Sequence, residues 1–426
     1  MANLLIIPQL SNYTREGTFV LEADSGWQMM TGRILEFLKL DPKMTIDVLG
    51  PFRSQLRTAP DKLNPTIFVG SRVRYVEVPI IANALATRYD FHFNNIAQSL
   101  ALEAHKTSDA LKYTHVYVND PMLLRHYKAL FNLRAGYQPK FIVHSHFVDN
   151  PEAPKFPTDA SLWLGQCEAA IRADYNFWQC ESAMNTFFTS MAKTFQQSVV
   201  DEVKSKSSPY DDGYSIAEIT SLVSYAGLRF DINDFYEKTK DKIVIFVPNR
   251  VGGKGVSSDY TNCGKFLFEL LPQLRATRQD FVIIAGNPSQ KFTNKQLEEM
   301  CGEHGYINLV EDGFTRDEYK FVAAKSDVVV GLYNDDAFGG TSSRECIELG
   351  CLPLWLNVNE YKSIAEQAGG YPYVIEPDFS NFLEVASSLL DNVEKSVWLP
   401  ALQKVVRARC SYEMTTPVAL AQMGIL

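Results

Sequence analysis

The sequence of 426 residues predicts an α/β protein with two doubly wound parallel sheets. Short runs rich in Val, Ile and Leu alternate with longer amphipathic stretches, which is typical of parallel strands buried on both faces and joined by helices. A second series of the same kind follows an irregular polar segment at 204–213. A chain of this length has room for two such domains.

In the first half, the apolar runs predict six strands with helices between them at 26–40 and 121–131. The sixth strand overlaps an aromatic stretch at 173–178 that we expect to lie in the core. The segment 204–213 is rich in Lys, Ser, Asp and Gly and is predicted to be an exposed loop. The predicted strands are 4–7, 45–49, 74–78, 115–118, 140–144 and 175–179.

The second half predicts a second Rossmann-like lobe. Its predicted strands are 242–248, 281–285, 307–310, 327–332 and 352–356, and its predicted helices are 264–274, 316–324 and 342–349. The helical pattern at 393–412 is expected to cross back and pack on the first lobe. The predicted domains are therefore 1–235, 236–392 and a C-terminal helical segment, 393–426.

Composition narrows the classes of partner and compartment. Lys and Arg total 41 against 50 Asp and Glu, so the net charge of −9 does not favour non-specific binding to nucleic acid or anionic lipid. No run reaches the roughly 18 apolar residues that span a bilayer. The seven cysteines include no Cys-x-x-Cys pair, which favours a reducing cytoplasm over a zinc or disulfide framework.

The residues after the predicted strand 327–332 carry the strongest functional pattern. Gly339 and Gly340 allow close backbone approach, and the helix that starts near Thr341 and Ser342 offers N–H groups and a positive dipole end to a diphosphate. Glu345, one turn into that helix, is placed to accept two ribose hydroxyls. The alternative is structural, because Ser342-x-x-Glu345 is also a capping box.

Two further strand ends support a phosphate site. Arg250 and Lys254 lie on a glycine-rich turn after the strand 242–248, where an Arg and a Lys can grip a phosphate. Taken alone, this turn is equally compatible with a solvated loop. Gly286 directly follows the strand 281–285, where a residue without a side chain leaves room for a ligand.

The first half offers polar residues at corresponding places. His144 and His146 stand where the strand 140–144 runs into a polar turn, and Asp120 follows the strand 115–118. Gly26 begins the first long helix. Each has a structural alternative, either as a core hydrogen-bonding group or as a helix start. His-x-His is also a metal-ligand spacing, but no other ligand cluster accompanies it, so no metal site is predicted.

The order of these motifs over about residues 240–380 resembles that of retaining GT-B glycosyltransferases, in which two Rossmann-like lobes face a cleft. The resemblance implies that Arg250 and Lys254 neutralise the diphosphate of a nucleotide-sugar donor, and that Glu345 binds its ribose. It also implies that His146 lies beside the transferred sugar. The spacing departs from the family at Ala337, eight residues before Glu345, so Asp336 is the candidate for the sugar-binding acid and Asp335 its rival.

The resemblance implies retaining transfer from a UDP-sugar, with no metal and no cofactor besides that substrate. Short motifs, His144-Ser145-His146 and Glu348-Leu349-Gly350, resemble those of phage DNA α-glucosyltransferases. A hydroxymethylated DNA base is therefore the first candidate acceptor and a saccharide the second. A sugar-nucleotide epimerase or hydrolase, or a non-catalytic nucleotide-sugar-binding subunit, stays open. Candidates for a DNA-binding basic face are Arg53, Arg57, Arg72, Arg74, Arg125, Lys128 and Arg134.

Overall fold

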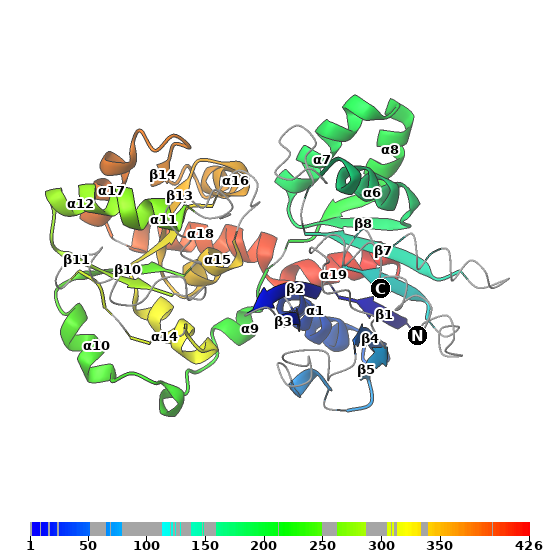
Figure 1. Cartoon of the computed structure of the whole chain (residues 1–426), viewed down its shortest axis with the longest axis horizontal. Helices are drawn as coiled ribbons and strands as arrows, with labels where there is room; N and C mark the ends of the chain where they lie inside the picture. Colours follow the sequence, from blue (N-terminus) through cyan, green and yellow to red (C-terminus); the bar gives the residue numbers. More distant parts are fainter. Residues whose placement is uncertain are drawn as a thin grey trace. The chain divides into compact units, whose positions relative to one another are not determined.

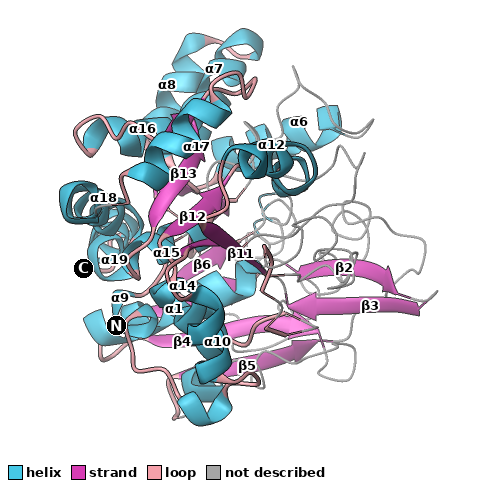
Figure 2. Ribbon diagram, turned by 90° about the vertical axis from the view of Figure 1, so that its left-hand side faces the viewer, coloured by secondary structure: helices cyan, strands magenta, loops and turns pink. Residues whose placement is uncertain are grey.

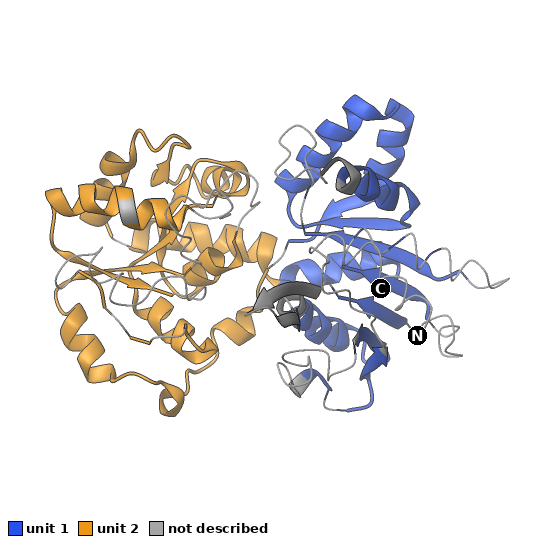
Figure 3. Cartoon of the chain, in the orientation of Figure 1, with its two compact units in different colours: residues 1–212, 412–426 blue, residues 213–411 orange. Residues whose placement is uncertain are grey.

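The computed structural model divides the chain into two compact units (Figure 1, Figure 3). Unit 1 is Met1–Asp212 with Tyr412–Leu426, and unit 2 is Gly213–Ser411. The structure describes residues 2–8, 10–15, 18–23, 25–51, 65–68, 70–78, 113–119, 121, 124, 128, 138–146, 148, 159–211, 213–248, 262–286, 305–307, 309–310, 313–333, 340–393 and 395–426.

Unit 1 is built on a seven-stranded parallel sheet with the order β5-β4-β1-β6-β7-β8-β9. An antiparallel hairpin, β2 (Leu10–Arg15) and β3 (Thr18–Ala23), follows β1 and precedes helix α1 (Ser25–Leu40) (Figure 2). The strands are β1 Asn3–Ile7, β4 Thr45–Pro51, β5 Val73–Val78, β6 His115–Val118, β7 Lys140–Ser145, β8 Tyr175–Trp178 and β9 Ser207–Pro209.

Both faces of this sheet are covered. On one face, α1 and α19 (Tyr412–Met423) enclose a core that includes Phe37 and Leu420. On the other face, Trp163 and Trp178 belong to the core formed with the three helices α6 (Asp159–Arg172), α7 (Glu181–Thr194) and α8 (Gln197–Ser205). A short 3₁₀ turn, η2 (Pro65–Phe68), completes the described elements. The burial of Phe177 and Trp178 confirms the prediction that 173–178 lies in the core.

Unit 2 carries a five-stranded parallel sheet with the order β11-β10-β12-β13-β14. Its strands are β10 Ile243–Val247, β11 Phe281–Ala285, β12 Val328–Gly331, β13 Leu352–Leu356 and β14 Val374–Ile375. Its helical elements are α9 Ile216–Ile219, η6 Tyr225–Gly227, α10 Ile232–Thr239, α11 Cys263–Lys265, the π-helical turn η7 Phe266–Leu270, α12 Leu271–Thr277, α14 Arg316–Lys325, α15 Thr341–Glu348, α16 Asn359–Gln367, α17 Phe382–Asp391 and α18 Lys395–Cys410.

Alternation along β10 shows why this sheet is covered on both faces. Ile245 and Val247 enter one core, whereas Val244 and Phe246 enter the other. Side chains of a strand point alternately to opposite faces, so a continuous apolar run needs two cores. The predicted class, two doubly wound Rossmann-like lobes, is confirmed.

The C-terminal helix packs on unit 1, as predicted. Thr416 of α19 hydrogen-bonds the hydroxyl of Tyr210 at 2.9 Å, and the backbone oxygen of Met423 lies 3.2 Å from Nε2 of His115. Helix α18 instead belongs to unit 2, because Leu402 and Val406 are buried in its core. The crossing therefore falls at 411/412, whereas the sequence placed the boundary at 392/393.

Three other predictions differ from the structure. The first boundary lies at 212/213 instead of 235/236, because Phe235 of α10 packs into a core of unit 2. The expected exposed loop at 204–213 contains β9, and Tyr210 is buried because its ring stacks 5.7 Å from that of His144. Of the expected strand at 307–310, residues 307, 309 and 310 are not in a strand, and an isolated bridge joins Ile283 to Tyr306 at the edge of the sheet.

Gly213 lies where the backbone approaches the end of α18 too closely for a side chain. The backbone N–H of Tyr214 donates to the Cys410 oxygen at 3.1 Å, and a Cβ at Gly213 would lie 1.6 Å from that same oxygen. We expect Gly213→Ala to lower the free energy of unfolding by about 3 kcal/mol, because backbone must move. Urea unfolding measures the loss.

Gly227→Ala is the matched control, because a Cβ there meets no atom within 4 Å. It should change the free energy of unfolding by less than about 0.5 kcal/mol. Equal stability of the two variants would contradict the close approach at Gly213.

Candidate functional site

The carboxyl ends of the strands in unit 2 bring several predicted site residues to one edge of the sheet. Gly286 follows β11, and its N–H donates to the oxygen of Val247 at the end of β10 at 3.0 Å. A Cβ at Gly286 would lie 3.5 Å from the Pro248 oxygen, so the ends of β10 and β11 adjoin closely. Ligands of open α/β sheets bind at such an edge.

Gly340 lies at the start of α15 and approaches an aromatic ring closely. It is the N-cap residue, and its N–H donates to the Tyr361 hydroxyl at 2.7 Å. A Cβ at Gly340 would come within 1.8 Å of the ring of Tyr333, so a side chain is excluded there. Thr341 and Ser342 begin the helix, as the predicted diphosphate cradle requires.

Glu345 is buried one turn into α15 and is held by an arginine. Its two carboxylate oxygens accept from Arg316, with Nη1 at 3.0 Å from Oε2 and Nη2 at 2.7 Å from Oε1. Because α15 begins at Thr341, Ser342 lies inside the helix and is not its N-cap. The capping-box alternative is therefore wrong, and the carboxylate of Glu345 is placed for side-chain chemistry.

A capping box does form at the neighbouring helix. Thr315 is the N-cap of α14, and its hydroxyl accepts from the backbone N–H of Glu318, whose carboxylate accepts from the backbone N–H of Thr315. This arrangement fixes the first turn of α14. Arg316 is the first residue of that turn, so its guanidinium reaches Glu345 from a rigid base.

Three tyrosines surround the start of α15: Tyr361 is buried, and Tyr319 and Tyr333 are half-buried. The Tyr319 hydroxyl donates to the backbone oxygen of Ser342 at 2.8 Å, and the Tyr333 hydroxyl lies 3.0 Å from the Ser342 hydroxyl. Burial raises the pKa of Tyr361 to about 12 and the pKa values of Tyr319 and Tyr333 well above their usual range. All three therefore stay neutral and supply hydrogen bonds without adding negative charge near the helix start.

In unit 1, His144 belongs to a buried network at the end of β7. Its Nδ1 lies 2.9 Å from a guanidinium nitrogen of Arg33 and 2.7 Å from the Tyr117 hydroxyl. Arginine keeps its protons, so Nδ1 must accept and the imidazole proton is on Nε2. Arg33 also donates to the backbone oxygen of Asp211 at 3.1 Å. This geometry gives His144 a structural role, and its acceptor-side role stays a prediction.

His146 lies directly beside this network. Its ring stacks on that of His144 with 4.6 Å between centroids, and its Nε2 lies 2.5 Å from Oδ1 of Asn119, the residue after β6. An amide oxygen accepts only, so Nε2 carries the proton. His146 is 4% exposed. Asn119 after β6 and His146 after β7 are therefore paired at the carboxyl edge of the sheet, where the sequence predicts the acceptor-binding side.

The remaining predicted site residues stay predictions. Gly26 lies in the first turn of α1. Residues outside the described ranges are Arg250, Lys254, Asp336, Gly339 and Asp120, together with Asp335.

Sequence reasoning missed Arg316, Arg33 and Asn119. For Arg316 a signal existed: a cation in the first turn of a helix opposes the helix dipole, so such a residue implies acidic partners. Arg33 and Asn119 carry no comparable signal, because Arg33 lies inside α1 and Asn119 follows β6, so neither opposes a helix dipole.

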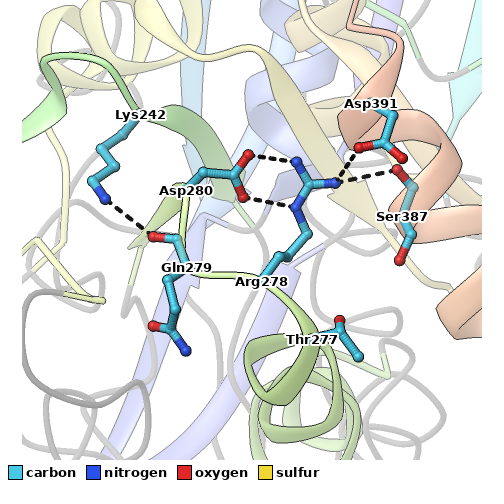
Figure 4. Close-up of a pocket in the computed structure, with 7 residues that line it drawn as sticks. All are labelled: Lys242, Thr277, Arg278, Gln279, Asp280, Ser387 and Asp391. Atoms are coloured by element: carbon cyan, nitrogen blue, oxygen red, sulfur yellow. Dashed lines mark hydrogen bonds and ion pairs between the residues drawn. The ribbon is translucent and has the colours of Figure 1, made fainter.

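A surface pocket in unit 2 lies at the opposite edge of the sheet, where β10 and β11 begin (Figure 4). Arg278 lines it and pairs with Asp280 at 2.5 Å and with Asp391 at 2.9 Å. The hydrogen bond between Arg278 and Asp280 raises the pKa of Arg278 and lowers that of Asp280. This cation is already neutralised and joins α17 to the sheet, so the pocket is not assigned to the site.

In the described ranges, no three His, Cys, Asp or Glu side chains are grouped to hold a metal ion, and no helix is long and apolar enough to cross a membrane. Six cysteines in these ranges are buried: Cys167, Cys180, Cys263, Cys346, Cys351 and Cys410.

The Glu318 carboxylate predicts a pH dependence of stability. Burial alone would raise its pKa, but hydrogen bonds from Arg229 and from backbone N–H groups hold it at about 2, below the ordinary 4.5. A lowered pKa stabilises the folded state fully above pH 4.5, and this stabilisation is lost as the pH falls towards 2. Glu318→Gln should therefore lower stability at neutral pH and flatten its decline between those values, measured by urea unfolding.

Glu384→Gln is the control for this experiment, because Glu384 is exposed on α17. Its pH profile of unfolding should follow that of the wild type. A Glu318→Gln profile as steep as the wild type would contradict the ion pair with Arg229.

Comparison with known proteins identifies the fold. No protein-family model and no curated protein sequence matches the chain. Among solved structures, Anabaena HepE in complex with UDP-glucose is similar with a TM-score of 0.65 and 12% identity, covering 100% of both chains. A glycosyltransferase from Rickettsia africae gives 0.67 and 11%, covering 99% of this chain and 97% of that one.

A UDP-forming α,α-trehalose-phosphate synthase from Burkholderia xenovorans gives a TM-score of 0.67 and 12% identity, covering 100% of this chain and 99% of that one. These structural neighbours are GT-B glycosyltransferases. At such low identity the likeness concerns the fold: two Rossmann-like lobes of the GT-B type.

Proposed function

We propose that this protein is a glycosyltransferase that moves a sugar from a UDP-sugar to a hydroxyl of an acceptor. The observation that carries this proposal is the geometry at α15. This helix begins directly after Gly340, and one turn later the carboxylate of Glu345 is held by Arg316. The fold shared with UDP-sugar enzymes supports the same donor class.

The spacing along α15 suits a nucleoside diphosphate. Glu345 lies four residues after Thr341, so the carboxylate is displaced from the helix start by about 6 Å along the axis. A ribose is attached directly to the first phosphate of a nucleoside diphosphate. A diphosphate bound at the helix start would therefore bring the ribose hydroxyls to Glu345.

The proposed chemistry needs positive charge at the leaving diphosphate. Arg250 and Lys254, which follow β10 in the sequence, are proposed to stabilise that charge together with the N-terminus of α15. Asp336 would bind the sugar hydroxyls. His146 would line the acceptor side. We propose retention of the anomeric configuration, with no metal ion and no cofactor besides the nucleotide sugar.

For the acceptor, the described part of the predicted basic face favours a saccharide over DNA. Arg74 is paired with Asp47 at 2.5 Å, and Arg72 and Arg74 lie where β5 begins, away from the carboxyl edge. Lys128 donates to the backbone oxygen of Arg172. These cations are engaged within unit 1, so we propose a saccharide hydroxyl as acceptor and keep the hydroxymethylated DNA base as the competing prediction.

Incubation with a panel of nucleotide sugars, saccharides and hydroxymethylated duplex DNA tests the proposal. Mass spectrometry should detect a glycosylated saccharide, and NMR should show the anomeric configuration of the donor retained. Glycosylated DNA, with salt-sensitive DNA binding, would instead establish the first sequence-based prediction.

Incubation with donor alone separates the remaining alternatives. Rapid conversion to a new or free sugar without acceptor would favour an epimerase or hydrolase. Binding of UDP without any turnover across the panel would favour a non-catalytic nucleotide-sugar-binding subunit.

A further inference from the structure

Arg316 joins two acidic residues from different helices of unit 2. Besides both oxygens of Glu345 on α15, it contacts both oxygens of Glu218 on α9, with Nε at 3.1 Å from Oε1 and Nη2 at 2.6 Å from Oε2. Burial would lower the pKa of Arg316, but the two carboxylates raise it above its ordinary value. The guanidinium thus acts as a fixed cation shared by two anions.

Contacts made by neighbouring residues support the position of Arg316. The capping box at Thr315 and Glu318 fixes the start of α14. Lys320, on the same helix, donates to the backbone oxygen of Glu218 at 3.1 Å and so holds α9 against α14. The Arg316 guanidinium also lies 5.4 Å from the ring centre of Tyr319.

The position of Arg316 in its helix is electrostatically unfavourable unless nearby carboxylates compensate for it. As the first residue of α14, it places a cation at the positive end of the helix dipole. The ion pairs with Glu218 and Glu345 offset that repulsion. Glu345, with a side chain 10% exposed, in turn gains one defined orientation.

The Glu345 carboxylate can accept more hydrogen bonds than Arg316 donates to it. An ionised carboxylate has about four acceptor positions, and Arg316 occupies two of them. Among the described residues no other group donates to these oxygens, which leaves two acceptor positions, one on each oxygen. A pair of neighbouring hydroxyls, such as the 2′- and 3′-hydroxyls of a ribose, matches that number.

We propose that Arg316 is a positioning residue for nucleotide recognition: it fixes the Glu345 carboxylate so that its remaining acceptor positions select a ribose diol. This inference rests on the proposed function, because it assigns a task to the same site. Removal of Arg316 would free the rotamer of Glu345 and leave it near Glu218, whose like charge disfavours two ionised carboxylates.

The test compares binding of UDP and 2′,3′-dideoxy-UDP by isothermal titration calorimetry. In the wild type, loss of two hydroxyls that donate to a charged group should weaken binding about 100-fold. In Arg316→Gln, this ratio should fall to less than about 5-fold, because the carboxylate is no longer oriented. A purely structural role would lower stability and leave the ratio unchanged.

Arg407→Gln, on α18, is the matched control, because it also removes an ion pair to a glutamate of α15. Arg407 grips Glu348 of α15 with two nitrogens, at 2.6 Å and 2.8 Å, so its removal costs a comparable ion pair. It should lower the melting temperature and keep the wild-type ratio. Glu218→Gln should keep the ratio too, because Arg316 then retains Glu345 as its partner.

Arg316→Lys guards against a variant that fails to fold, because it keeps the charge and loses the planar fork. It should show a reduced ratio at near-normal stability. A wild-type ratio in folded Arg316→Gln or Arg316→Lys would overturn the inference while leaving the proposed function intact. Absence of UDP binding to the wild type would instead contradict the proposed donor, and the inference with it.

Discussion

Glu345→Ala is expected to weaken binding of UDP about 100-fold, because two hydrogen bonds from ribose hydroxyls to a charged carboxylate contribute about 1.5 kcal/mol each. The fold should survive, since Arg316 keeps Glu218 as an ionic partner at 2.6 Å. Isothermal titration calorimetry measures the loss, and circular dichroism checks that the variant is folded.

The control for this variant is Glu366→Ala, on the exposed face of the neighbouring helix α16. It removes the same charge from unit 2 and should leave UDP affinity unchanged. If Glu345→Ala bound UDP as tightly as this control, Glu345 would not be the ribose ligand and the donor site would have to lie elsewhere.

The parts of the fold that the sequence predicted well are those set by local pattern. β11 and β13 were predicted with their observed bounds, because a strand buried on both faces must be apolar at every position. β9 was missed, because its residues, Ser207–Pro209, are polar and lie at the end of the sheet. The hairpin β2–β3 was missed as well.

For the candidate site too, the features set by local sequence could be predicted and those set by distant residues could not. The helix start at Gly340 could be predicted, because glycines after a strand and before a helix are a local signal. The partner of Glu345 could not, since Arg316 lies 29 residues earlier in the sequence and meets it only when α14 packs beside α15. Similarly, the role of His144 depends on Arg33, 111 residues away.

The sequence-based assignment of Arg250 carries the largest expected effect on catalysis. Arg250→Ala should lower kcat about 100- to 1,000-fold, because a fixed cation at a leaving diphosphate stabilises charge that develops in the transition state. UDP already carries its charge in the ground state, so its affinity should fall less than kcat. Steady-state kinetics with the donor identified by the panel measures the first quantity, and calorimetry the second.

Lys242→Ala is the matched control, because Lys242 precedes β10 and Arg250 follows it. Each variant removes one positive charge near one end of β10. Lys242 is at the amino end, where it donates to the backbone oxygen of Gln279. A general effect of net charge on donor attraction would lower both activities equally. A specific role at the diphosphate requires that only Arg250→Ala lowers kcat, and that Arg250→Lys restores part of it, since a lysine keeps the charge without the forked contact. Equal activities of the two alanine variants would favour the alternative that Arg250 belongs to a solvated turn. The proposed mechanism would then lack its main catalytic cation.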